Sequence, residues 1–109
     1  MHELALMDSI VEAIEERLGD ARVVTVRLCV GRLAAVLPDA LRFCFDVCAA
    51  GTSMEGAALD IVESPGRGRC RDCGAEVELE DLLSRCPCGS ATVDVIGGEE
   101  LRLEAVEVI

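Results

Sequence analysis

The sequence predicts an α/β (α+β) fold, in which two helices lie on a three-stranded sheet as a small two-layer domain, with an inserted cysteine-rich module. Three observations lead to this prediction. Apolar residues recur at helical spacing in two segments, aliphatic residues form three strand-like segments, and four cysteines fall within residues 70–88. With 109 residues, 51% of them hydrophobic, the chain can bury the core of one domain beside a small module.

The first helix is expected over residues 3–18, because its apolar residues recur every three or four positions. Gly19 is placed to end this helix, since glycine readily adopts the backbone conformation of a helix C-cap. The second helix is expected to run from Pro38, which favours a first helical turn, to Gly51. Its apolar stripe consists of Leu41, Cys44, Phe45 and Cys48.

The three strands of the main sheet are expected in three aliphatic segments rich in β-branched residues. They are "RVVTVRLCVG", which ends at Gly31, then "AALDIVES", and finally "ELRLEAVEVI" at the end of the chain. A shorter strand, "ATVDVI", is expected directly after the cysteines. The aliphatic content of the last segment indicates that it returns to the main sheet.

The cysteine segment is therefore interpreted as an insertion between two strands and not as a tail. Proline, glycine and arginine cluster in residues 64–70, and this change of composition is interpreted as a linker. The predicted domains are residues 1–65 together with 96–109, and residues 66–95 as the inserted module.

Charge excludes some classes of function. The net charge is −11, from 21 acidic and 10 basic residues, and every basic residue is arginine. Such an acidic chain is not expected to bind nucleic acid or an anionic membrane surface, because both require basic residues. No signal peptide or transmembrane segment is expected, which indicates a cytoplasmic protein. In a reducing compartment, clustered cysteines indicate metal or redox chemistry more often than disulfides.

The four clustered cysteines have the spacing C-x2-C-x12-C-x-C, which is typical of a zinc ribbon. A glycine follows the second cysteine of each pair, where it tolerates unusual backbone angles. The site is interpreted as structural Zn(II) with four thiolates, because the module has too few apolar residues to fold alone. Two disulfides or a redox dithiol are the alternatives. The proposed ligands are Cys70, Cys73, Cys86 and Cys88.

The remaining cysteines are interpreted as small buried apolar residues. Cys44 and Cys48 lie four residues apart on the second expected helix, so a soft-metal site or a cross-link is the alternative there. No nucleophile and base pair, G-x-S-x-G motif or phosphate loop is present, so the chain is not expected to be an enzyme.

His2 is the only histidine in the chain. One interpretation is an exposed residue at a frayed chain end. The other is a metal site, in which the Met1 amine, the His2 imidazole and a backbone nitrogen of His2 or Glu3 lie in one plane. Such a nitrogen set suits Ni(II) or Cu(II) better than Zn(II).

Several motifs occur together in a recognisable order. "MHE" begins the chain, "GRL" follows the first strand, "PDALRFCF" lies in the second helix, and "GT" follows that helix. A C-x-x-C pair and "CPCGS" come next, and "GGEELRLEAVEV" closes the chain. Over the whole length from Met1 to Ile109, these motifs resemble the HypA/HybF family of hydrogenase nickel-incorporation proteins.

The resemblance implies a nickel metallochaperone with a nickel-binding α/β domain and an inserted zinc-binding domain. Such a protein binds Ni(II) at its N-terminus and delivers it to the large subunit of [NiFe]-hydrogenase, with the maturation GTPase HypB as partner. In some organisms the family also serves urease. The implied nickel ligands are His2 and the backbone nitrogens of His2 and Glu3. The implied zinc ligands are the four clustered cysteines, and the chain is expected to be a monomer or homodimer.

The sequence departs from the family pattern in the second cysteine box. The family usually has C-P-x-C-G, whereas this chain has one residue fewer, in Cys86-Pro87-Cys88-Gly89. The alternative function is a zinc-ribbon adaptor that binds a protein and delivers no metal. That alternative explains the cysteines but gives His2 no role.

Overall fold

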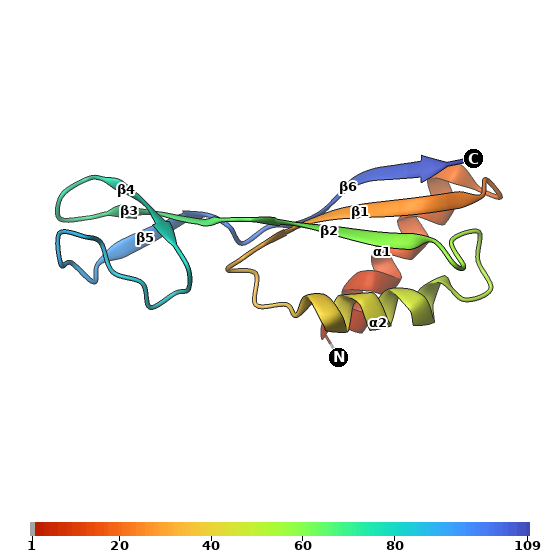
Figure 1. Ribbon diagram of the computed structural model, residues 1–109, viewed down its shortest axis with the longest axis horizontal. Coiled ribbons are helices and arrows are strands. Elements are labelled where there is room, and N and C mark those ends of the chain that lie inside the picture. The colour runs from red at the N-terminus through yellow and green to blue at the C-terminus, as the bar shows by residue number, and fades with distance from the viewer. Residues whose placement is uncertain (1) are drawn as a thin grey trace. The chain divides into compact units, whose positions relative to one another are not determined.

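The structure is a computed structural model that describes the backbone of residues 2–109 and the side chains of residues 3–109. It contains two helices and two three-stranded sheets, so the predicted α+β class is confirmed (Figure 1). The chain forms two compact units. The first comprises the residues up to Leu28, Val36–Ile61 and Leu103–Ile109, and the second comprises Cys29–Ala35 and Val62–Arg102.

The first sheet has the strand order β2-β1-β6. Its strands are β1 (Val23–Gly31), β2 (Ala58–Ser64) and β6 (Leu101–Val108). The Val23 N–H donates to the Ser53 carbonyl and the Arg32 N–H to the Ser64 carbonyl, so β2 runs parallel to β1. At the other edge, the Gly31 N–H donates to the Glu100 backbone carbonyl, and the Ile109 N–H donates to the Arg22 backbone carbonyl. The strand β6 therefore runs antiparallel to β1. The predicted return of the last strand to the main sheet is confirmed.

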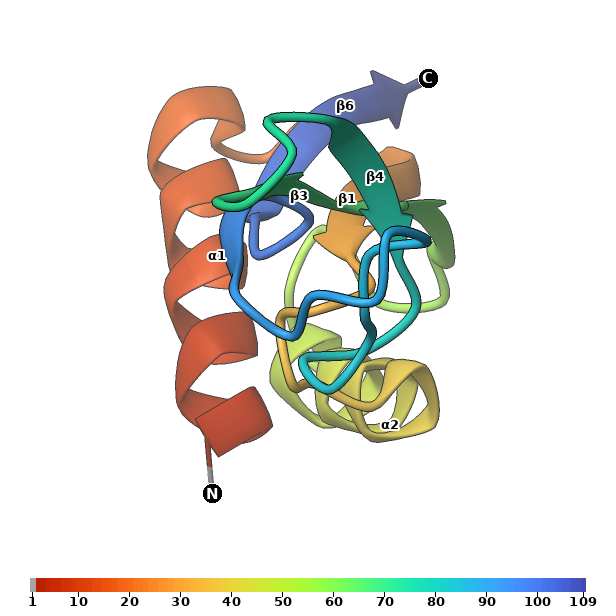
Figure 2. The same cartoon turned by 90° about the vertical axis from the view of Figure 1, so that its left-hand side faces the viewer.

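The two helices, α1 (His2–Leu18) and α2 (Pro38–Ala49), pack against each other on the same side of this sheet (Figures 1 and 2). The crossover from β1 to the parallel strand β2 passes through α2, as parallel neighbours require a long connection. The core of the first unit is aliphatic apart from Phe45, which is 1% exposed. Its other large, fully buried side chains are Met7, Val23, Val26, Leu28, Leu41 and Met54. Among the residues described, no helix is long and apolar enough to cross a membrane.

The second sheet has the order β4-β3-β5, formed by β4 (Glu76–Leu79), β3 (Gly66–Cys70) and β5 (Val93–Gly97). Both neighbours of β3 are antiparallel to it. The linker predicted over residues 64–70 is wrong, because most of that segment forms the central strand of this sheet. Its period is two residues, with Gly66, Gly68 and Cys70 buried and the arginines between them exposed.

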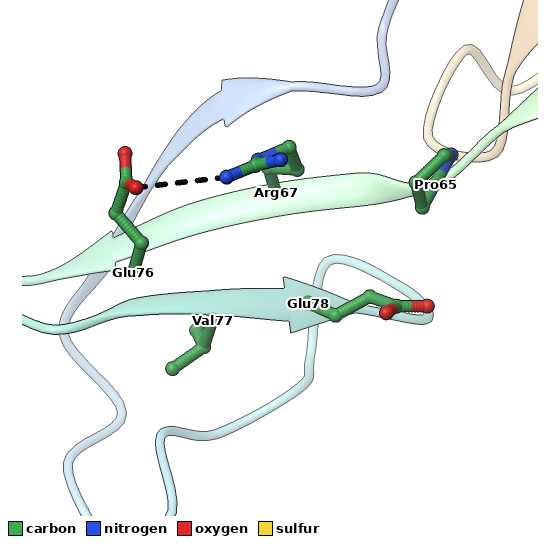
Figure 3. A pocket seen from close by; sticks show the side chains of 5 residues that line it. All are labelled: Pro65, Arg67, Glu76, Val77 and Glu78. Carbon is green, nitrogen blue, oxygen red and sulfur yellow. Dashed lines mark ion pairs between the residues drawn. The ribbon is translucent and has the colours of Figure 1, made fainter.

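The arginines of β3, and Arg71 directly after it, pair with acidic residues on the neighbouring strands. Arg67 and Arg69 both lie beside Glu76, and Arg71 donates to both carboxylate oxygens of Asp94. Figure 3 shows Arg67 and Glu76 at a hollow of about 190 Å³ over β3 and β4. Pockets that bind small molecules are usually at least about 300 Å³, so this hollow is too small for such a site.

Three glycines allow backbone segments of the second unit to cross in close contact. A Cβ at Gly31 would lie 2.1 Å from the Gly98 carbonyl oxygen, and one at Gly98 would lie 2.4 Å from the Gly66 Cα. Gly98 also has a φ of 94°, which favours glycine. The Gly98 N–H donates to the Glu100 carboxylate, which also accepts a hydrogen bond from the Ser64 hydroxyl. The crossing thus depends on the absence of side chains at these positions.

Candidate metal centre

Four sulfur atoms converge in the second unit. Cys70 ends β3, Cys73 lies in the turn that follows, and Cys86 and Cys88 lie between β4 and β5. All four Sγ atoms lie within 4.8 Å of one another. Cys70 and Cys86 are buried, whereas Cys73 and Cys88 are exposed. The four cysteines expected to act together are therefore brought together by the fold.

The spacing of the sulfur atoms matches a tetrahedral zinc site. The Sγ atoms of Cys70 and Cys88 are 3.6 Å apart, and so are those of Cys73 and Cys86. Four sulfurs at about 2.3 Å from a tetrahedral Zn²⁺ would lie about 3.8 Å from one another. A disulfide would require about 2.05 Å, and all four cysteines are free. The donor set and its geometry thus fit Zn(II) and not a pair of disulfides.

The first cysteine pair lies on a turn closed by backbone hydrogen bonds. The Gly74 N–H donates to the Cys70 carbonyl at 3.0 Å, and the Cys70 N–H donates to the Ala75 carbonyl at 2.9 Å. Gly74 has a φ of 75°, which relieves strain at the end of the turn. The Cys73 N–H lies 3.5 Å from the Cys70 sulfur and donates to it. This turn directs both thiols of the pair to one point.

The second cysteine pair also lies on a turn closed by a backbone hydrogen bond, but it has one residue fewer between its cysteines. The Gly89 N–H donates to the Cys86 carbonyl at 2.8 Å, so this turn closes over three residues where the first closes over four. The Cys86 N–H donates to the Ser90 carbonyl at 3.0 Å, and Gly89 has a φ of 96°. The shortened box therefore makes a tighter turn, while its sulfurs keep the distances that zinc requires.

The four thiols differ in acidity. The Cys73 N–H that donates to Cys70 lowers the pKa of the Cys70 thiol to about 6. For Cys86, the backbone N–H of Cys88 lowers the pKa, but burial and the neighbouring thiols outweigh it and raise the pKa to about 12. The two pKa values diverge because hydrogen bonds among the four thiols favour the thiolate of Cys70 and disfavour that of Cys86. A bound divalent cation would lower the pKa of all four thiols, because it favours the thiolate at every position.

Little hydrocarbon surrounds this centre. The apolar residues of the module include Val77, Leu79, Leu82 and Leu83. Leu82 and Leu83 are 65% and 88% exposed, and Val77 is half-buried. Leu79 is the only one of the four that is buried. From residue 66 to 97, the buried positions are Gly66, Gly68, Cys70, Leu79 and Cys86.

The other cysteines lie outside the centre. Cys29 and Cys44 are buried, as predicted for small apolar residues, and Cys48 is half-buried on α2. Within residues 3–109, the four clustered cysteines are the sole group of three or more metal-ligating side chains that could hold one ion. No cross-link joins Cys44 and Cys48, since both are free.

The proposed N-terminal site falls mostly outside the described residues. This applies to Met1 and to the His2 side chain. Glu3 is half-buried in the first turn of α1. The first N–H groups of a helix have no carbonyl four residues before them, so the amide nitrogens of His2 and Glu3 are not needed for helix hydrogen bonds.

Comparison with known proteins places the chain in a family. The family model described as "Hydrogenase/urease nickel incorporation, metallochaperone, hypA" matches residues 1–108. The chain belongs to this HypA family. The hydrogenase maturation factor HypA of Nostoc punctiforme is 47% identical over 108 residues, which cover 99% of this chain and 96% of the relative. That of Geobacter metallireducens is 44% identical over 109 residues, which cover 99% of both chains.

The fold agrees with solved HypA structures. The solution structure of the Ni metallochaperone HypA from Helicobacter pylori aligns with a TM-score of 0.65 at 23% identity, over 98% of this chain and 97% of that one. Membership of the HypA family makes this chain a nickel metallochaperone of hydrogenase maturation and not an enzyme. The resemblance stated from the sequence motifs is thus confirmed.

Proposed function

We propose that this chain binds Ni(II) at its N-terminus and delivers it to the large subunit of [NiFe]-hydrogenase. The proposed donors are the His2 imidazole and the backbone nitrogens of His2 and Glu3. Membership of a nickel-incorporation family over residues 1–108 carries the proposal. The chemistry supports it, because imidazole and amide nitrogens are donors that Ni(II) prefers. The weak competition of helix hydrogen bonds at the first turn supports it further.

The proposed role of Zn(II) is structural. Four thiolates would occupy all four tetrahedral positions, so no position would remain for a substrate. The ion would be held by Cys70, Cys73, Cys86 and Cys88. It would thereby connect the turn of the first cysteine pair to the turn of the second. We assign the zinc-binding domain to residues 66–95 and the nickel-binding domain to residues 1–65 and 96–109.

The proposed partners follow from the family. They are the GTPase HypB, which accompanies nickel insertion, and the hydrogenase large subunit as client, with urease as a second client in some organisms. The relatives' names support hydrogenase as the main client. We propose a cytoplasmic location and a monomeric or homodimeric state.

A nickel titration tests the proposal. Tag-free protein with one zinc per chain is titrated by calorimetry, and the absorbance bands of planar Ni(II) are followed. We expect one nickel per chain in the wild type and loss of that site in His2→Ala, with zinc unchanged. Glu3→Gln is the matched control, because it retains the backbone nitrogen and removes only the carboxylate. Nickel binding should survive in this variant.

Two results would count against the proposal. Equal nickel binding in wild type and His2→Ala would leave His2 without a role and favour a zinc-ribbon adaptor. Loss of nickel binding in Cys86→Ser with His2 intact would place nickel at the cysteines. In His2→Ala, the zinc content, measured by mass spectrometry, separates the two sites. In Cys86→Ser, an unchanged helical circular dichroism signal separates loss of a nickel ligand from loss of the fold.

A further inference from the structure

The outer face of α2 holds two large apolar side chains in water. Phe43 and Val47 lie one helical turn apart and are 68% and 52% exposed. The other aromatic residue of the chain, Phe45, lies on the opposite side of the helix and is 1% exposed. Aromatic residues are enriched at the centres of protein interfaces, where they contribute most of the binding energy. The fold of the first unit does not use Phe43, so its exposure calls for another explanation.

A furrow between the two helices continues this apolar face. The hollow has a volume of about 580 Å³. Its walls are formed by Leu4, Ala5, Asp8, Val47 and Cys48. Val47 belongs both to this wall and to the exposed row with Phe43. We call the surface formed by Phe43 and these five residues the α1–α2 furrow. A volume of this size accommodates apolar side chains of a docked segment.

One acidic residue lines the furrow, and two more lie beside Phe43 on α2. Asp8 forms part of its α1 wall. On α2, Asp39 lies one turn before Phe43 and Asp46 lies one turn after it. Within residues 3–109, none of these three carboxylates forms an ion pair or a side-chain hydrogen bond. The nearby Arg42 donates to the Leu59 carbonyl at 2.6 Å and so is engaged with β2.

We propose that the α1–α2 furrow is a docking surface for a basic amphipathic helix of a partner protein. The apolar row of that helix would cover Phe43 and Val47, and lysine or arginine residues on its flanks would face Asp8, Asp39 and Asp46. A furrow between two helices suits a helix, since it offers no free strand edge for an extended peptide. A second copy of this chain is disfavoured, because a two-fold interface here would place acidic residues opposite acidic residues. The proposal is independent of nickel binding.

Two designed peptides of about 15 residues test the chemistry, a length that permits a marginally stable helix. Both carry leucine at helical spacing, and one has lysine and the other glutamate at the remaining positions. Fluorescence anisotropy with the zinc-loaded protein should show one lysine peptide bound per chain and no binding of the glutamate peptide. Phe43→Ser should weaken binding at least about tenfold, because it removes an interface anchor. The control Leu83→Ser removes an even more exposed apolar residue elsewhere and should change nothing.

Charge variants supply a second readout. Asp39→Asn and Asp46→Asn should reduce the salt dependence of lysine-peptide binding and leave the fold unchanged, as judged by circular dichroism and zinc content. Three results would overturn the proposal. They are an equal loss of affinity in Leu83→Ser and Phe43→Ser, equal binding of both peptides, and a concentration-dependent dimer that Phe43→Ser abolishes. The last result would identify the occupant as a second copy. Nickel titration of the same variants keeps this test separate from that of the nickel site.

Discussion

The sulfur atoms of Cys73 and Cys86 lie 3.6 Å apart although 13 positions separate them in the chain. The contact joins a turn that closes over four residues to a turn that closes over three. Two turns of different length therefore present their thiols at one point. The missing residue of the second box changes the backbone of its turn, and the sulfur positions remain suitable for zinc.

Removal of one buried sulfur should abolish zinc binding. Cys86→Ser replaces a thiol that is 4% exposed with a hydroxyl, which is a poor zinc ligand. We expect less than one zinc per chain by mass spectrometry after dialysis, together with a lower melting temperature. Cys48→Ser is the control, because Cys48 lies on α2 outside the cluster. Zinc retained at one per chain in Cys86→Ser would show that three cysteines suffice.

Gly89 should be important for zinc affinity because of its backbone. Its φ of 96° is unfavourable for residues with a Cβ, and an alanine there should cost about 1–3 kcal/mol. Gly89→Ala is therefore expected to weaken zinc binding by roughly 5- to 150-fold in a competition titration with a chelator. Gly89→Asn should be milder, since asparagine tolerates positive φ better than alanine. The same affinity in all three proteins would mean that the tight turn adapts without strain.

The metal-free protein should form one thiolate well below the usual range for cysteine. The Cys73 N–H lowers the pKa of Cys70 to about 6, against about 8.5 in an unfolded chain. This lowered pKa stabilises the metal-free fold above the unfolded value, and that contribution is lost as the pH falls through about 6. Thiolate absorbance at an ultraviolet wavelength should show a first step near this pH.

Cys70→Ser should remove that first step. Cys48→Ser should leave it unchanged, because burial raises the pKa of Cys48 and it ionises later. A first step that persists without Cys70 would assign the acidic thiol to another residue of the cluster.

Adjacent glycines should respond very differently to alanine. In Gly98→Ala, the new methyl would lie 2.4 Å from the Gly66 Cα at a φ of 94°, and both effects are destabilising. We expect the free energy of unfolding to fall by about 2–5 kcal/mol, combining backbone strain and overpacking. In Gly97→Ala, the nearest atom would be 3.7 Å away, in the side chain of Arg67, so the change should be small. Urea unfolding of the two zinc-loaded variants compares them, and equal stability would mean that the crossing can separate without cost.

The sequence predicted the helices and the clustering of the four cysteines more reliably than the second sheet. The apolar residues of α1 and α2 recur with the helical period of 3.6 residues, and Pro38 begins α2 as predicted. The cysteine spacing similarly reflects local turn chemistry. The strand β3 was missed because its inward positions are glycines, which give no apolar signal. The strict alternation of glycine or cysteine with arginine in "GRGRCR" was the available indication.

Burial was harder to predict than secondary structure. Leu82 and Leu83 are apolar residues of the cysteine module, yet both are largely exposed. Hydrophobicity alone does not distinguish a core residue from a surface one in a segment without regular structure. The three glycines of the crossing were missed for a related reason. Their importance comes from contacts between segments distant in sequence, which no local pattern records.

The buried positions of the β4-β3-β5 sheet region are cysteines, glycines and one leucine, so hydrocarbon contributes little to its interior. Zinc bound only by the folded form would then supply its stability through mass action. Each tenfold rise in free zinc would favour the folded form by about 1.4 kcal/mol. A cell short of zinc would hold more of this chain with that region open to proteases. The amount of usable nickel chaperone would in this way depend on the supply of a second metal.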